Sequence, residues 1–259
     1  MLTAQIHPTA VIDPSADIGA DVAIGAYTVI GANVSIGAST TIGPHVHIVR
    51  DTRIGEGCAI HHAAALGGDP QDLKYAGECT ELAVGARTVI REFVTVSRGT
   101  GAQGRTDVGS DCLIMATAHI AHDCAIGDHV ILANAVNMGG HVTIEDNVIV
   151  GGLTAIHQFV RIGKHAFVGG SSAVRKDVVP YVKAAGDPLH LFGLNSVGLQ
   201  RRGFSEELRR ALKRAYRMFF QSSLNISQAV EQARTELPDS PELQHFLAFV
   251  EASKRGVTI

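Results

Sequence analysis

The sequence has few charged residues and lacks the signals of secreted and membrane-spanning proteins. Lys, Arg, Asp and Glu make up 18% of the 259 residues, and the formal net charge of -3 does not argue for nucleic-acid binding. The start, MLTAQIHPTA, has neither the basic nor the apolar region of a signal peptide. No segment reaches the roughly 18 uninterrupted apolar residues of a membrane helix. We therefore expect a cytoplasmic protein with no membrane insertion and no nucleic-acid partner.

Paired cysteines are also missing, and positive charge is concentrated in one segment. Cys58, Cys79, Cys112 and Cys124 form no C-x-x-C pair, which disfavours a metal ribbon and a disulfide framework. We expect reduced, structural cysteines and no metal. Residues 175–217 hold ten Lys and Arg against four acidic residues, a net of +6. A segment of this charge is suited to an anionic partner.

A six-residue repeat of aliphatic side chains extends over most of the chain. The repeated positions are Ile6, Ile12, Ile18, Ile24, Ile30, Ile36, Ile42, Ile48, Ile54, Ile60, Leu66, Val84, Ile90, Val96, Val108, Ile114, Ile120, Ile126, Leu132, Met138, Ile144, Val150, Ile156, Ile162, Val168 and Val174. A small or β-branched residue often stands four positions later, as at Val22 and Cys58, so both sets share one narrow interior. Glycine often follows the aliphatic residue, as at Gly19 and Gly31, where a sharply turning backbone favours a residue without Cβ. The chain therefore bends every six residues, and three strands close an 18-residue coil.

This pattern predicts an all-β, left-handed parallel β-helix over residues 1–185, followed by a small α-helical domain over 186–259. The repeat ends after Val178. Helical patterns then appear at 205–222, at 225–237 with Asn225 and Gln228 placed as a capping box, and from Ser240 onward.

Two gaps interrupt the repeat without changing its register. Segments 67–83 and 97–107 are therefore expected to replace strands of the β-helix and to project outward as loops. Projecting loops on a rigid scaffold often carry functional residues.

Several polar residues stack on one edge of the predicted coils, because residues 18 apart lie about 4.8 Å from each other on neighbouring coils. The residues on this edge are His122, Asp123, Gly140, His141, His157 and Gln158. A histidine next to an aspartate can act as a general base in a fixed tautomer, which suits His122 and Asp123. The N–H of Gly140 can stabilise a developing oxyanion. Cys124 belongs to the interior set, so direct group transfer fits better than a covalent intermediate.

Other polar residues allow more than one interpretation. A lone histidine on a turn of such a helix is most often solvated, which is our interpretation of His7, His45, His47, His129 and His165. Arg201 and Arg202 fit a solvated helix face and a diphosphate clamp about equally well.

Taken together, these residues resemble the acyl-carrier-protein-dependent UDP-N-acetylglucosamine O-acyltransferases that begin lipid A synthesis. The stretches that carry the resemblance are QDLKYAGE (71–78), VIREFVTVSRGT (89–100), AHIAHDCAIG (118–127), GGH (139–141), HQF (157–159), VGG (168–170) and RRGFS (201–205). A related N-acyltransferase family has an additional N-terminal uridine-binding domain; because the repeats start at Ile6, we expect no such domain here.

The resemblance implies transfer of a 3-hydroxyacyl group from acyl carrier protein to the 3-hydroxyl of the sugar nucleotide, in a homotrimer and with no cofactor. It makes His122 the general base, Asp123 its orienting partner and Gly140 the oxyanion contact. It implies contacts to the sugar or acyl group from Asp72, Lys74, His119, His141, His157 and Gln158. It implies nucleotide contacts from Asn195, Arg201 and Arg202, and gives Gly170 the role of a ruler for acyl length.

Some alternatives stay open at this point. Ser97 and Val197 depart from the histidine and the acidic residue that are usual in the family. Asn137 and Met138 leave open a 3-amino instead of a 3-hydroxyl acceptor. A γ-class carbonic anhydrase with zinc, an acetyl-CoA-dependent sugar acetyltransferase and a non-catalytic scaffold are further alternatives built on the same solenoid.

Overall fold

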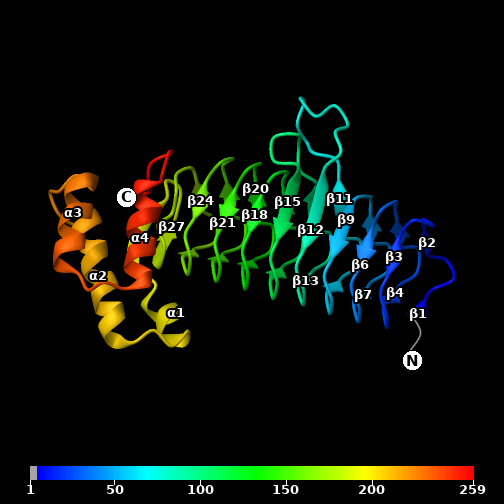
Figure 1. Cartoon of the computed structure of the whole chain (residues 1–259), viewed down its shortest axis with the longest axis horizontal. Helices are drawn as coiled ribbons and strands as arrows, with labels where there is room; N and C mark the ends of the chain where they lie inside the picture. Colours follow the sequence, from blue (N-terminus) through cyan, green and yellow to red (C-terminus); the bar gives the residue numbers. More distant parts are fainter. Residues whose placement is uncertain (1–4) are drawn as a thin grey trace.

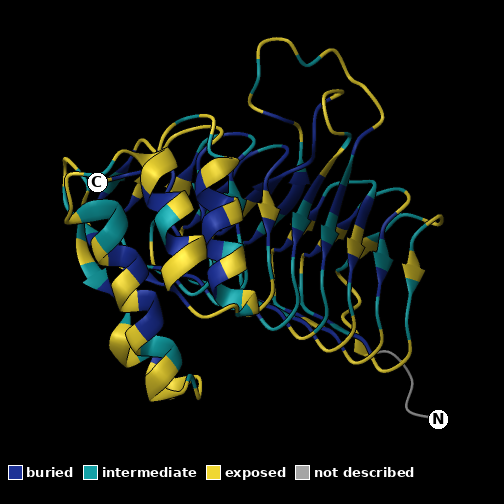
Figure 2. Cartoon of the chain, turned by 60° about the vertical axis from the view of Figure 1, so that its left-hand side comes forward, coloured by how far each residue is buried: buried dark blue, intermediate teal, exposed yellow. Residues whose placement is uncertain are grey.

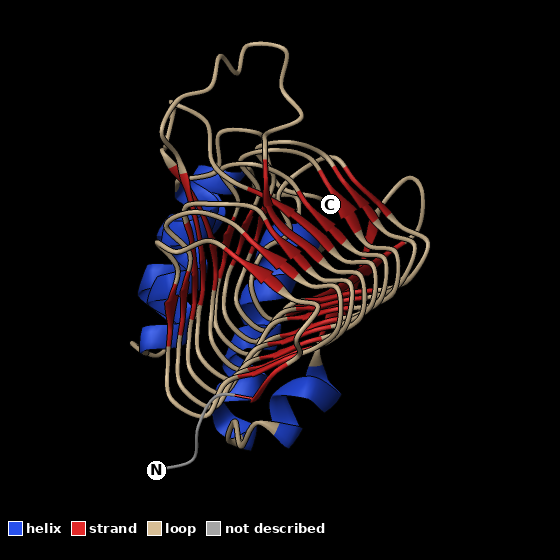
Figure 3. Cartoon of the chain, turned by 90° about the vertical axis from the view of Figure 1, so that its right-hand side faces the viewer, coloured by secondary structure: helices blue, strands red, loops and turns tan. Residues whose placement is uncertain are grey.

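A computed structural model describes residues 5–259 as a three-sided parallel β-helix with helices at its C-terminal end (Figures 1 and 3). The predicted fold class is confirmed. The first four residues of the predicted 1–185 domain lie outside the described residues. Within residues 5–259, no helix has the length and apolar character needed to cross a membrane.

The three sides of the prism are three sheets, which we name A, B and C. Sheet A contains β1 (Gln5–Ile6), β4 (Ala23–Ile24), β7 (Thr41–Ile42), β10 (Ala59–Ile60), β13 (Val89–Ile90), β16 (Leu113–Ile114), β19 (Ile131–Leu132), β22 (Ile149–Val150), β25 (Phe167–Val168), β27 (Val182–Ala185) and β28 (His190–Leu194). Sheet B contains β2 (Val11–Ile12), β5 (Val29–Ile30), β8 (His47–Ile48), β11 (Ala65–Gly68), β14 (Thr95–Ser97), β17 (His119–Ile120), β20 (Asn137–Met138), β23 (Ala155–Ile156) and β26 (Ala173–Val174). Sheet C contains β3 (Asp17–Ile18), β6 (Ser35–Ile36), β9 (Thr52–Ile54), β12 (Glu81–Val84), β15 (Arg105–Val108), β18 (Ala125–Ile126), β21 (Thr143–Ile144) and β24 (Arg161–Ile162).

The repeated aliphatic residues form the interior of the prism. Figure 2 shows that buried positions recur along the stacked coils. From Ile24 to Val174 all of them are buried, while Ile6 on the first described coil is 44% exposed. Cys58, Cys112 and Cys124 are buried with them, and Cys79 is exposed. Each coil thus contributes apolar side chains to one continuous core, whose burial stabilises the stack.

The glycines that follow the aliphatic residues are explained by the neighbouring coil. The left-handed residue of each turn stands two positions later, for example Asp21 with a φ of 58° after Gly19. A Cβ on Gly19 would lie 2.8 Å from the backbone N of Ala38, and one on Gly31 would lie 1.4 Å from the carbonyl oxygen of Val49. The expectation that sharp turning selects glycine is therefore wrong at these positions, where the close approach of the next coil selects it.

Both projecting loops are insertions at one corner of the prism and replace no strand (Figure 1). The first, 69–80, joins β11 to β12, and the second, 98–104, joins β14 to β15. The flanking strands pair with each other, β11 with β14 and β12 with β15. The expectation that 67–83 and 97–107 replace strands is therefore wrong, because the ends of both segments continue the neighbouring strands.

The C-terminal part contains the predicted helices and two features that the repeat did not indicate. The helices are α1 (Ser196–Arg201), α2 (Glu206–Phe220), α3 (Ile226–Glu236) and α4 (Pro241–Glu251). The capping box of Asn225 and Gln228 is confirmed at the start of α3. The sequence did not indicate α1, nor the antiparallel pairing of β27 with β28 that extends sheet A. Since this sheet continues past residue 185, the domain boundary there stays a prediction.

Candidate active site

The predicted polar residues meet at the B–C corner, which we define as the turns leading from each strand of sheet B to the next strand of sheet C. His122 and Asp123 follow β17, Gly140 and His141 follow β20, and His157 and Gln158 follow β23. The backbone N–H of His141 donates to the carbonyl oxygen of His122 at 3.0 Å. The predicted stacking of these turns is therefore confirmed.

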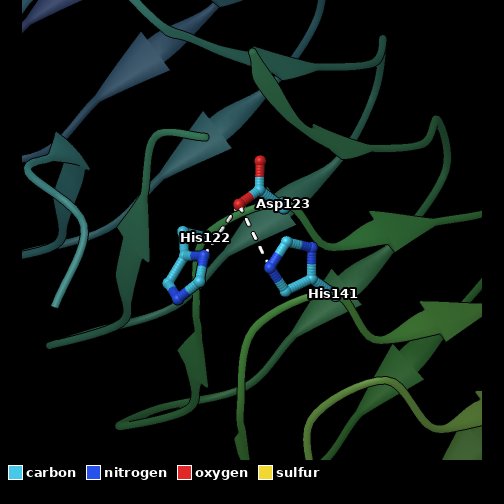
Figure 4. Close-up of side chains that lie close together, drawn as sticks. All are labelled: His122, Asp123 and His141. Atoms are coloured by element: carbon cyan, nitrogen blue, oxygen red, sulfur yellow. Dashed lines mark hydrogen bonds and ion pairs between the residues drawn. The ribbon is translucent and has the colours of Figure 1, made fainter. Parts of the chain in front are cut away.

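Asp123 is a buried carboxylate that lies between His122 and His141 (Figure 4) and accepts two hydrogen bonds from Thr100. Its Oδ1 accepts from the backbone N–H of Thr100 at 3.0 Å, and its Oδ2 accepts from the Thr100 hydroxyl at 2.7 Å. Its own N–H donates to the Thr106 hydroxyl at 2.8 Å. Burial raises the pKa of Asp123, but the hydrogen bonds from Thr100 and His122 outweigh it and hold the pKa below its ordinary value. The carboxylate is therefore ionised near neutral pH.

His122 lies next to this carboxylate with one ring nitrogen. Its Nδ1 is 2.8 Å from Oδ2 of Asp123, and Figure 4 shows its other nitrogen directed away from the carboxylate. Because an ionised carboxylate only accepts hydrogen bonds, the contact places a proton on Nδ1 and leaves the Nε2 lone pair free in the neutral ring. The side chain is 12% exposed, so it can still be reached from outside.

His141 completes the group on the other side of the carboxylate. Its Nε2 is 3.6 Å from Oδ2 of Asp123, which is too long for a hydrogen bond. Its ring stacks on Phe159 with the centroids 4.6 Å apart. Ligand-capable atoms of His122, Asp123 and His141 all lie within 4.8 Å of one another, close enough to hold a metal ion. The donor set alone therefore does not separate a general base from a zinc ligand.

Gly140 and Cys124 were predicted to supply an oxyanion contact and to belong to the interior, respectively. Among residues 5–259, no protein group accepts a hydrogen bond from the backbone N–H of Gly140. Burial raises the pKa of the Cys124 thiol to about 12, so it is not a nucleophile at neutral pH.

The second loop, 98–104, contains site residues that the repeat did not indicate. Besides Thr100, it carries Arg98, whose fully buried guanidinium donates to the carbonyl oxygen of Gly67, to Asp69 and to the Tyr75 hydroxyl. Arg98 thus connects the first loop to the second, and Thr100 connects the second loop to Asp123. Both residues lie in the quoted stretch VIREFVTVSRGT, which was the available signal.

Comparison with known proteins separates the possible chemistries. Residues 177–258 match the family model described as UDP N-acetylglucosamine O-acyltransferase, domain 2, and residues 105–140 match the bacterial transferase hexapeptide model of six repeats. An acyl-(acyl-carrier-protein)–UDP-N-acetylglucosamine O-acyltransferase of Myxococcus xanthus is 51% identical over 256 residues, which cover 98% of this chain and 99% of that protein. The chain belongs to the UDP-N-acetylglucosamine O-acyltransferase family. It is therefore an acyltransferase.

Solved structures of the UDP-N-acetylglucosamine O-acyltransferases agree with this assignment. LpxA from Acinetobacter baumannii superposes with a TM-score of 0.96 at 46% identity, covering 98% of this chain and 99% of that one. The acyltransferase from Arabidopsis gives a TM-score of 0.85 at 35% identity, covering 98% and 100%. The 3-amino-sugar and carbonic anhydrase alternatives gain no support from these relatives.

One chain does not bring all the predicted site residues of this family together. Asp72 and Lys74 lie on the first loop, where Oδ1 of Asp72 accepts from the N–H of Lys74 at 3.0 Å. His119 lies on β17, next to the B–C corner, with Nδ1 2.7 Å from the Thr95 hydroxyl. Burial, and then the neighbouring His122, lower the pKa of His119. These residues are on the His122 side of the prism.

The predicted nucleotide residues are at a different corner. Asn195 caps α1 by accepting from the N–H of Gly198 at 3.3 Å, and its amide donates to the carbonyl oxygen of His165 at 3.0 Å. Arg202 lines a groove of about 660 Å³ together with His165, in the turn from sheet C to sheet A. Arg201 ends α1 and is exposed. These residues are therefore at the C–A corner of the prism, whereas His122 is at the B–C corner.

The remaining predicted positions are Gly170 and the two departures from the family pattern. Gly170 follows β25 at the turn from sheet A to sheet B, so it and His122 are at different corners, as predicted. Ser97 is buried on β14, while Val197 is 60% exposed on α1. Their effects on nucleotide binding stay predictions.

Proposed function

We propose that the chain transfers a 3-hydroxyacyl group from acyl carrier protein to the glucosamine 3-hydroxyl of UDP-N-acetylglucosamine, the first step of lipid A biosynthesis. The relatives over nearly the full length are named for these two substrates. The basic segment 175–217 supports transient binding of an acidic carrier protein, because opposite charges increase the rate of encounter.

The observation that carries the proposed mechanism is the contact between Nδ1 of His122 and the buried carboxylate of Asp123 at 2.8 Å. With Nδ1 protonated, Nε2 removes the proton of the sugar 3-hydroxyl while the oxygen attacks the thioester carbonyl. The imidazolium that forms is stabilised by Asp123. The N–H of Gly140 donates to the carbonyl oxygen as negative charge develops on it. Collapse of the tetrahedral intermediate expels the carrier thiolate, which takes the proton back from Nε2.

The other predicted residues bind the substrates in this proposal. Around the sugar and acyl group we place Asp72, Lys74, His119, His141, His157 and Gln158. Around the nucleotide we place Asn195, Arg201 and Arg202. The reaction needs no resident cofactor, because the thioester is already activated for acyl transfer. We place the reaction in the cytoplasm.

The active unit in this proposal is a homotrimer. The separation of His122 and Arg202 to different corners supports it, because a neighbouring chain can supply the nucleotide residues that one chain keeps apart. A trimeric mass by light scattering is expected at micromolar concentration, and a monomeric mass would contradict the proposal. Mixed trimers of His122→Ala chains and Arg202→Ala chains should regain part of the activity, since some interfaces then contain both intact residues.

The proposed reaction is tested with purified protein, UDP-N-acetylglucosamine or its 3-amino analogue, and a panel of 3-hydroxyacyl carrier proteins, with products read by mass. His122→Ala should lower turnover at least about a hundredfold, the usual scale for loss of a general base. His47→Ala is the matched control, because His47 is an exposed histidine on β8 of the same sheet. Near-normal turnover of His122→Ala would reject the assigned base, and preference for the amino analogue would correct the acceptor.

A further inference from the structure

The C-terminal tail after α4, residues 252–259, is fixed to the end of the B–C corner by a buried carboxylate. Asp177 is 1% exposed and accepts from the backbone N–H of Arg161 at 2.9 Å and from the Ser253 hydroxyl at 2.7 Å. The backbone N–H of Asp177 also donates to the carbonyl oxygen of Gly256 at 3.1 Å, and its carbonyl oxygen accepts from the N–H of Thr258 at 2.7 Å. The tail is therefore held against the last turn of the B–C corner.

Arg255 extends from this tail to His157. Its Nη2 is 3.2 Å from Nδ1 of His157, and its guanidinium also donates to the backbone oxygen of Arg175 at 3.3 Å and 3.4 Å. Arg175 stands 18 residues after His157, so the guanidinium bridges two successive turns of the corner. The two contacts to one backbone oxygen define where the guanidinium lies.

Two neighbours compete for opposite tautomers of the His157 ring. A guanidinium has only donors, so its contact with Nδ1 is a hydrogen bond only when Nδ1 carries no proton. The carbonyl oxygen of Gln158, 3.1 Å from the same Nδ1, is an acceptor and requires a proton there.

We propose that Arg255 is a positioning residue that selects the His157 tautomer with the proton on Nε2. Among residues 5–259, no protein group accepts from this Nε2, so its N–H is available to an oxygen of the bound substrate. Without Arg255, Nδ1 carries the proton and donates a hydrogen bond to the Gln158 carbonyl oxygen, and Nε2 changes from donor to acceptor. This inference rests on the proposed function only in assigning His157 to the substrate site.

The tautomer is measured directly on the full chain with ¹⁵N-labelled histidine, in the absence of substrate. His157 is assigned by the signals lost in His157→Gln. In the unsubstituted protein Nε2 should carry the proton, and in Arg255→Met the proton should move to Nδ1. Arg255→Lys keeps a charged donor and should keep the tautomer. Arg175→Met is the matched control, because it removes a guanidinium from the same corner that pairs with Asp187 and does not contact His157 through its side chain.

The kinetic consequence is a fall of about tenfold in kcat/KM for Arg255→Met, the size of one lost hydrogen bond, with most of it restored in Arg255→Lys. A proton on Nδ1 of the unsubstituted protein, or the same tautomer in Arg255→Met, would overturn the proposal. The tautomer measurement does not depend on acyl transfer, so failure of the proposed reaction would be recognised separately by inactive unsubstituted enzyme.

Discussion

Gly140 lies against the imidazole of His122, and a Cβ at residue 140 would be 2.4 Å from Cε1 and 2.6 Å from Nε2 of that ring. Real Cβ atoms do not approach so closely, so any other residue at 140 displaces the ring. The absence of a side chain at Gly140 is therefore a condition for the position of His122 beside Asp123.

We predict that Gly140→Ala lowers kcat by about a hundredfold, because the displaced ring no longer delivers Nε2 to the substrate. The measurement is steady-state kinetics on Gly140→Ala, His122→Ala and the double variant. If Gly140 acts through His122, the double variant should be about as slow as His122→Ala alone. Fully additive losses would show that Gly140 acts independently of the ring.

Thr100→Val should impair the site through Asp123. The variant removes the hydroxyl that donates to Oδ2 at 2.7 Å and keeps the side-chain volume, so a buried carboxylate loses one partner. We expect kcat to fall about tenfold, and Thr100→Ser, which keeps the hydroxyl, to retain most of the activity. Equal losses in both variants would assign the effect to packing of the loop.

The same substitution has a predicted effect on acid stability. A carboxyl whose folded-state pKa lies below the unfolded value of about 3.9 stabilises the fold above that value, and this contribution is lost as the pH falls through the folded-state pKa. Removing the Thr100 hydroxyl raises the pKa of Asp123 toward its unfolded value. Acid unfolding of Thr100→Val should therefore begin at higher pH than that of Thr100→Ser, which circular dichroism can follow.

The β-helix was predictable because each aliphatic residue of the repeat has the same environment, so period and burial follow from local sequence. The stacking of His122 beneath Gly140 followed from the same arithmetic. The hydrogen bonds from Thr100 to Asp123 could not be predicted in this way, because the loop 98–104 interrupts the 18-residue repeat. The contact of Arg255 with His157 joins residues 98 apart that share no repeat. Short elements such as α1 are determined by packing that no periodic pattern records.

His165 makes the stability depend on pH in another range. His165 is half-buried, with its ring against Tyr181 and Phe204, so the expectation that it is solvated is wrong. Burial, and then the charges of Lys164 and Arg202, lower the pKa of His165 to about 4. Between this value and the unfolded value of about 6.5, the unfolded chain binds more protons, so stability falls as the pH decreases. His165→Phe keeps an aromatic ring near Phe204, whose centroid is 5.0 Å away, and removes the titrating group. As the pH falls from 7.5 to about 4.5, the melting temperature of His165→Phe should decrease less than that of the unsubstituted protein. If the two melting temperatures fall in parallel, the pH dependence does not come from His165.

The final prediction concerns acyl length and Gly170, whose role as a ruler stays a prediction. Gly170 stands 48 residues after His122, which places it about 13 Å further along the axis at the spacing of neighbouring strands. Because the two residues are at different corners, we expect Gly170 to reach the acyl chain mainly from a neighbouring chain of the proposed trimer. A Cβ at 170 would lie 3.1 Å from the carbonyl oxygen of Gly152, a contact that small shifts can relieve, so substitution should be compatible with folding.

Gly170→Met should therefore change selectivity without unfolding the protein. Each methylene excluded from an apolar groove costs about 0.8 kcal/mol, so each excluded methylene should cost the variant about fourfold in preference for longer donors. Gly170→Ala adds only one methyl group and should change the order of preference among acyl donors little. The measurement is kcat/KM across 3-hydroxyacyl carrier proteins of increasing length. If Gly170→Met keeps the parent's ranking, the acyl tail ends before this position or leaves the corner in another direction, because a methionine placed against the tail has to shorten the preferred chain.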